Sequence, residues 1–121
     1  MLLDAAGPTD NMLARLQLEG LQAEKLIYQH YASGFEDLAD YFESLERDWQ
    51  GWADARTWTS IETDLQIRAE HDGHVRLTVE LRSPQDRLWS AMAYLTIDAG
   101  EQLSLIATQS RQLALTAAGQ E

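Results

Sequence analysis

Cysteine is absent from this 121-residue chain, and basic residues are scarce. The lack of thiols excludes disulfides, thiolate metal sites and cysteine nucleophiles. Nine lysines and arginines face 20 aspartates and glutamates, which gives a formal net charge of −11. So acidic a surface disfavours binding to nucleic acid and to anionic membranes, and it suits a basic protein partner.

The sequence also lacks a recognisable secretory signal and any long apolar run. The first basic residue is Arg15, and no apolar stretch approaches the ~20 residues of a membrane-spanning helix. We therefore predict a soluble, cytoplasmic protein. The apolar fraction of 45% suits one globular domain. We expect a flexible leader over residues 1–11, a single α+β domain over 12–115 and a flexible tail over 116–121.

Alternation of apolar and polar residues with a period of two predicts most of the strands. In the last of them, Met92 and Tyr94 lie on the face opposite the main apolar set, which indicates that this strand is partly covered on both sides. The predicted strands cover residues 12–19, 22–31, 57–69, 75–82 and 87–97.

Two helices are predicted from apolar residues spaced three and four apart. The first runs from Ser33 to Trp49, with Ser33 and Glu36 as a capping box and Gly51 as the residue that ends it. The second follows Asp98, which is predicted to cap it, with Glu101 completing a second box-like pattern. Together these elements predict an α+β fold, in the order β-β-α-β-β-β-α, with an antiparallel sheet of about five strands and two helices on one face. The stripe of the first helix comprises Phe35, Leu38, Phe42, Leu45, Trp49 and Trp52.

The turn 71–73 leaves two registers open for the hairpin between the third and fourth predicted strands. A left-handed bulge at Gly73 pairs residue 67 with 77, and it also sets Arg68 opposite Arg76. A shift by two residues pairs Glu70 with Arg76 instead. Turn chemistry favours the first register and charge favours the second; we predict the first.

The first helix carries the strongest charge signal of the chain, with seven acids and one base between residues 33 and 55. We predict that this acidic face binds a basic protein and that the tryptophans following it anchor the partner. Asp40 and Glu43 point away from the apolar stripe, so we expect lysines in their place to leave the fold intact and to slow association. A solvated face that keeps the protein soluble is the alternative. The candidate partner-binding residues are Glu36, Asp37, Asp40, Glu43, Asp48, Trp49, Trp52 and Trp58.

Support for catalysis is weak, because the chain has no nucleophile elbow, no Ser-x-x-Lys motif and no glycine-rich phosphate loop. His71 and His74 flank a predicted turn and are the only tight metal-capable cluster. We expect no catalytic residue, no metal and no cofactor. A small enzyme or metal-dependent sensor using this turn is the alternative. A homodimeric structural domain using an uncovered sheet face is another, and both monomer and homodimer stay open.

Several motifs resemble a bacterial family named domain of unknown function six-two-two-eight. They are D-W-x-G-W from Asp48, R-x-W-x-S from Arg56, H-D-G-H-V from His71 and G-E-Q-L from Gly100. The resemblance covers about residues 34 to 107 and implies no catalytic residue. The family is in turn similar in size, acidity and layout to small immunity proteins of bacterial polymorphic-toxin systems. By this analogy we expect an immunity protein that occludes a toxin domain.

Overall fold

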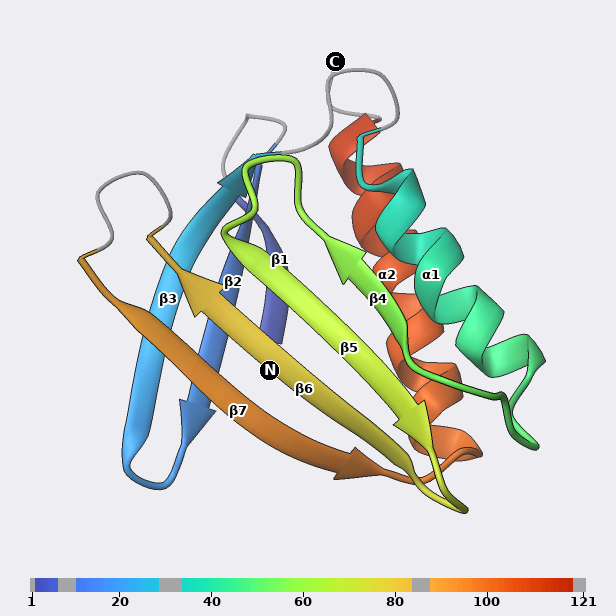
Figure 1. Ribbon diagram of the computed structural model, residues 1–121. Helices are drawn as coiled ribbons and strands as arrows, with labels where there is room; N and C mark the ends of the chain where they lie inside the picture. The colour runs from blue at the N-terminus through green and yellow to red at the C-terminus, as the bar shows by residue number, and fades with distance from the viewer. Residues whose placement is uncertain (1, 7–10, 29–33, 84–87, 119–121) are drawn as a thin grey trace.

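The computed structural model describes residues 2–6, 11–28, 34–83 and 88–118, which form seven strands and two helices (Figure 1). Within these residues, no helix is long and apolar enough to cross a membrane. The elements are β1 (Leu2–Ala6), β2 (Asn11–Leu18), β3 (Leu21–Tyr28), α1 (Glu36–Arg47), β4 (Arg56–Thr59), β5 (Leu65–His71), β6 (Val75–Arg82), β7 (Ser90–Ile97) and α2 (Glu101–Ala118).

The strands form two antiparallel sheets, with the orders β1-β2-β3 and β4-β5-β6-β7. Helices α1 and α2 pack side by side near β4, and the three-stranded sheet lies behind β6 and β7 (Figure 1).

The α+β class and the two helices are confirmed. The single sheet of about five strands is wrong: there are two sheets, and β1 lies within the segment 1–11 that we expected to be a leader. Helix α2 likewise continues to Ala118, inside the expected tail.

A buried polar turn divides the predicted strand 57–69 into β4 and β5. The Ser60 hydroxyl donates to Asp64 Oδ1 (2.6 Å) and accepts the backbone N–H groups of Asp64 and Leu65 (3.1 and 2.9 Å). Ile61, which is in phase with the inward residues Leu65 and Ile67 of the predicted strand, is therefore exposed. The period-two pattern missed this turn because a short polar loop can follow the same alternation as a strand.

The core is built from the apolar faces that the alternation predicted. On β6, for example, Val75, Leu77, Val79 and Leu81 are all buried. Each such side chain contributes about 1.5–3 kcal/mol by leaving water. By contrast, Met92 and Tyr94 on the other face of β7 are exposed. The expectation that β7 is partly covered on both sides is therefore wrong at Tyr94, which is 76% exposed, while Met92 is about half covered.

Helix α1 begins later and ends earlier than predicted. Phe35 occupies the N-cap position, and Ser33 lies outside the described residues. The helix ends at Arg47 with Asp48 as its C-cap, so Gly51 is not the terminating residue. Trp49 and Trp52 consequently leave the helical stripe, which buries only residues up to Leu45.

Helix α2 begins with reciprocal hydrogen bonds centred on Asp98. Its Oδ1 accepts the N–H groups of Gly100 (2.9 Å) and Gln102 (3.2 Å). Gln102 Oε1 accepts the Asp98 N–H in return (2.8 Å). The capping role of Asp98 is confirmed, while Gln102 rather than Glu101 completes the box, since its side chain reaches the free N–H.

The β5–β6 hairpin adopts the second of the two registers, so our preference for the first was wrong. Glu70 lies opposite Arg76, and His71 lies opposite Val75. This register avoids the Arg68–Arg76 juxtaposition. The turn also satisfies its own backbone, because Asp72 N–H donates to the His74 carbonyl (3.1 Å). Gly73 sits in the middle of the turn and has a φ of +102°.

Replacing Gly73 with valine should destabilise the protein by about 1–3 kcal/mol, because a β-branched residue is strained at positive φ. A Cβ atom added here would meet no atom within 4 Å beyond the chain neighbours, so the expected loss comes from backbone strain. Urea unfolding measures the loss. His74→Val, at an exposed neighbour without positive φ, is the matched control. Equal stability of the two variants would contradict the strain argument.

Candidate functional site

Arg111 on α2 engages two of the predicted partner-binding acids on α1. Its Nη2 lies 2.6 Å from Asp40 Oδ1 and 2.8 Å from Glu43 Oε1, and its Nε donates to Glu43 Oε2 at 2.9 Å. The guanidinium therefore holds the two helices together through a bidentate pair and a third bond. Lysines at 40 and 43 would remove these bonds and face Arg111 with like charge, a cost that the expectation of an intact fold did not include.

The ion pairs also shift the pKa values of Glu43 and Arg111. The hydrogen bond from Arg111 lowers the pKa of Glu43 from its ordinary 4.5, although burial opposes the change. The hydrogen bonds to Glu43 and Asp40 raise the pKa of Arg111. Glu43 is therefore charged wherever the protein is folded near neutral pH. Glu36 and Asp37 have no ion pair among the described residues, and of these two Glu36 is exposed.

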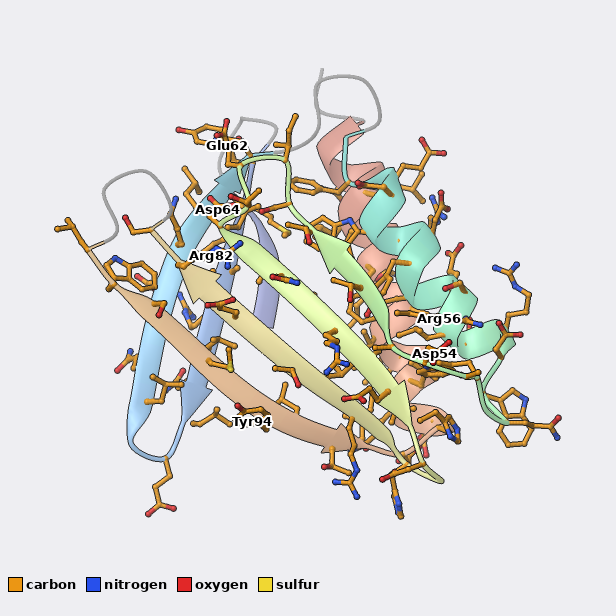
Figure 2. All side chains as sticks on the ribbon, in the orientation of Figure 1. Asp54, Arg56, Glu62, Asp64, Arg82 and Tyr94 are labelled. Carbon is orange, nitrogen blue, oxygen red and sulfur yellow. The ribbon has the colours of Figure 1, made fainter. Side chains whose placement is uncertain are left out.

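Arg56 organises the loop that follows α1. It pairs with Asp48 (2.8 Å), donates to the Ser44 carbonyl at the helix end (3.2 Å) and lies over the Trp52 ring, 5.2 Å from its centroid. The Tyr41 hydroxyl donates to the Arg56 carbonyl (2.8 Å), and burial raises the pKa of that hydroxyl. Figure 2 shows Arg56 and Asp54 together at this end of α1.

The three predicted anchor tryptophans have different environments. Trp58 is 8% exposed and lies in the core; its Nε1 finds no hydrogen-bond partner among the described residues. Trp52 is half-buried and donates from Nε1 to the Ala69 carbonyl (3.3 Å). Trp49 is 51% exposed. Only Trp49 presents a large apolar surface to a partner, so the structure does not gather the three into one exposed cluster.

His71 fixes the backbone that carries Trp49. Its Nδ1 accepts the Gly73 N–H (3.2 Å), so Nε2 carries the proton and donates to the Trp49 carbonyl (2.8 Å). The ring also stands edge-on to Trp52, with 5.1 Å between centroids. Two predicted motifs, D-W-x-G-W and H-D-G, thus meet in one corner of the molecule.

Two groups that the sequence reasoning did not assign are Arg111 and the pair of Lys25 with Asp64. Lys25 Nζ lies 3.0 Å from Asp64 Oδ2, and Asp64 is 1% exposed. Lys25 is the sole lysine, and it shares the inward parity of Ile27 on β3, which was the available signal. The sequence separation between Arg111 and α1 gave no signal of their contact.

The candidate site is therefore the corner around Trp49, which we call the Trp49 corner: Glu46, Asp48, Trp49, Asp54 and Arg56. Glu46 lies in the last turn of α1, and its carbonyl accepts the Trp49 N–H (3.3 Å), so the two residues are close at the helix end. Asp54 is exposed and has a φ of +60°, a conformation that Asp tolerates better than most residues. Among the residues that the structure describes, no group of three or more metal-capable side chains gathers. The corner is suited to contact another protein through one aromatic ring and carboxylates.

The model of a family of unknown function, DUF6228, matches residues 3–117, so the chain belongs to that family. The match is wider than the segment 34 to 107 that carried the sequence resemblance, and it includes most of β1 and nearly all of α2. No curated protein and no solved structure matches the chain significantly.

Glu43→Gln should lower the free energy of unfolding at neutral pH by roughly 0.5 kcal/mol, the usual size for a partly exposed pair. A lowered pKa in the folded state adds stability above pH 4.5 that disappears as the pH falls through the lowered value. The difference from wild type should therefore shrink in acid. Urea unfolding across pH measures it. Glu46→Gln, whose residue has no ion pair among the described ones, should show no such trend; a pH-independent loss in Glu43→Gln would contradict the argument.

Metal removal should leave the protein unchanged, because both ring nitrogens of His71 are already engaged within the turn and by Trp49. We expect EDTA to leave the melting temperature where it is. Heteronuclear NMR of the imidazole should show the proton on Nε2. Stoichiometric zinc in the purified protein, or a His71 ring protonated on Nδ1 alone, would show this assignment to be wrong.

Proposed function

We propose that this protein is a non-enzymatic binding protein, an immunity protein that occludes a basic bacterial toxin domain in the cytoplasm. The observation that carries the proposal is the half-exposed indole of Trp49, which follows the more acidic of the two helices and whose backbone is fixed by hydrogen bonds with Glu46 and His71. An exposed aromatic residue beside charged side chains is typical of an interface anchor.

Charge and aromatic surface have separate roles in this proposal. Acids on α1 raise the rate of encounter with a basic partner, since steering acts over several ångströms through water. Trp49 holds the docked partner by burying apolar area, which acts mainly on the dissociation rate. The helix rise of 1.5 Å per residue separates Glu36 from Arg47 by about 16 Å, and Trp49 follows two residues later, so Glu36 and Trp49 lie at opposite ends of α1. A partner that covers both therefore needs an interface of ordinary size.

The ion pairs found on α1 refine the set of binding residues. Asp40 and Glu43 keep α1 rigid through Arg111, and they offer a partner less free charge than Glu36 or Glu46. Asp48 similarly orients the loop through Arg56. Trp52 supports the site through its contacts with Arg56 and His71, and Trp58 lies in the core. The proposal thus keeps Glu36, Asp37 and Trp49 as contacts and assigns supporting roles to the other predicted residues.

The immunity role rests on the analogy of size, acidity and layout, together with the charge of the surface. Enzymes that act on nucleic acids carry basic active-site surfaces, which are complementary to an acidic helix. The metal-sensor alternative has less support, because His71 is engaged through both ring nitrogens.

The test is to measure association with a partner captured from the host or encoded beside the gene. Trp49→Ala should raise the dissociation rate about 30-fold or more, as expected for a hot-spot aromatic. Glu46→Lys should slow association several-fold at low salt, and high salt should remove most of that difference. Lysine in the last helical turn suits the helix dipole, so folding is preserved.

Glu62→Lys is the matched control, because it makes the same charge change on an exposed turn at the far end of β5 (Figure 2). It should associate nearly as fast as wild type. If Glu46→Lys and Glu62→Lys behave alike and Trp49→Ala binds as wild type does, the Trp49 corner is not the binding site.

A further inference from the structure

We propose that β7 is a self-association edge, through which two copies of this chain pair antiparallel to form one continuous sheet. The proposal is independent of the toxin-binding role, which concerns α1 and the Trp49 corner. It rests on the composition of β7, on the direction of its backbone groups and on the distribution of charge.

β7 is an unprotected sheet edge. Among the described residues it pairs only with β6, in one unbroken register over all eight residues. Its sequence, SAMAYLTI, contains no charged residue, proline or glycine. Proteins usually protect exposed edges with such residues, with bulges or with short strands. A long, regular, uncharged edge is therefore a surface that another strand can extend.

The other edge strands show the protection that β7 lacks. β4 has only four residues, and the Tyr41 hydroxyl of α1 occupies the Arg56 carbonyl. β3 carries Glu24 and directs Lys25 inward to the buried Asp64. β1 packs against α2. The contrast singles out β7 within the part of the chain that the structure describes.

The hydrogen-bond pattern shows which backbone groups face outward. Ser83 N–H donates to the Trp89 carbonyl (3.0 Å), so residues 83 and 89 form a hydrogen-bonded pair. In an antiparallel ladder such pairs alternate; Ala91, Ala93 and Leu95 therefore also bond to β6. The alternate residues direct their N–H and C=O groups to the open edge; they are Ser90, Met92, Tyr94 and Thr96.

A two-fold axis at Ala93 satisfies all of these outward groups at once. It sets Met92 of one copy opposite Tyr94 of the other and Ser90 opposite Thr96. These side chains share the outer face, where Met92 is 46% and Tyr94 76% exposed. Ala93 of one copy lies opposite Ala93 of the other in a non-hydrogen-bonded pair. The Cα atoms are closer in such a pair than in a hydrogen-bonded one, so a small side chain fits there. A thioether against an aromatic ring is a favourable contact.

The distribution of charge favours a second copy of this chain as the partner of the β7 edge. Two chains of charge −11 repel one another through most of their surface. The outer face beside β7 is balanced in charge, because its three arginines each pair with a carboxylate: Arg68 with Glu70, Arg76 with Asp72 and Arg82 with Glu80. Two copies therefore meet without local repulsion at this edge, and a basic partner would gain nothing from it.

Sedimentation velocity over a range of protein concentrations tests the proposal. A single strand edge buries less than a standard interface, so we expect reversible dimerisation in the micromolar range. Tyr94→Lys should weaken association at least about tenfold, since it removes the contact with Met92 and brings two like charges near the axis. Thr59→Lys, at an exposed position of β4 on the opposite edge, is the matched control and should dimerise like wild type.

Thr96→Pro supplies an independent variant, because its N–H points outward and the β6 ladder does not use it. It should lower dimerisation without lowering the melting temperature by more than a few degrees. Hydrogen exchange gives a direct readout: the amides of Met92, Tyr94 and Thr96 should gain protection as concentration rises, while that of Ala93 stays protected throughout. A wild-type protein that stays monomeric at the highest concentration overturns the proposal. So does a dimer that forms without protection of these amides or persists in Tyr94→Lys.

Discussion

One ion pair between a half-buried lysine and a fully buried aspartate, Lys25 with Asp64, links the two sheets. A carboxylate that is 1% exposed needs a close partner, because an unpaired buried charge costs several kcal/mol. Lys25 comes from the three-stranded sheet, and Asp64 comes from the turn that opens β5 in the other sheet. Ser60 satisfies the remaining Asp64 oxygen. The pair thus defines where β3 lies on the four-stranded sheet, and the apolar core fills the space that results.

Local patterns in the sequence were sufficient to predict most of the strands and helices. The alternation found the inward faces of β2, β5, β6 and β7, and the three-four spacing found the buried side of α1. Asp98 could be recognised as a cap, and Gly73 as a residue with positive φ, because both depend on neighbours in the chain. These predictions succeeded where the deciding contacts are local.

Several predictions failed because the deciding partner is distant in the sequence, whereas the β5–β6 register failed because turn chemistry and charge favoured different local pairings. Arg111 reaches acids 68 and 71 residues away, and nothing in the spacing indicates this. The exposed acids of α1 consequently seemed freer than they are. The helix end at Arg47 likewise separated Trp49 from the stripe, so that one tryptophan faces solvent and another fills the core. Of the candidate site, the sequence indicated the region but not which side chains are available.

The packing of β1 against α2 has a consequence for how the chain folds. The first described strand and the last described helix contact each other, so a closed core requires both. A ribosome adds residues in order, and β1 must wait until α2 emerges. Contacts of such long sequence separation slow folding and prolong the lifetime of open intermediates. The nascent protein therefore passes through a stage with exposed strand edges, during which chaperones have access to it.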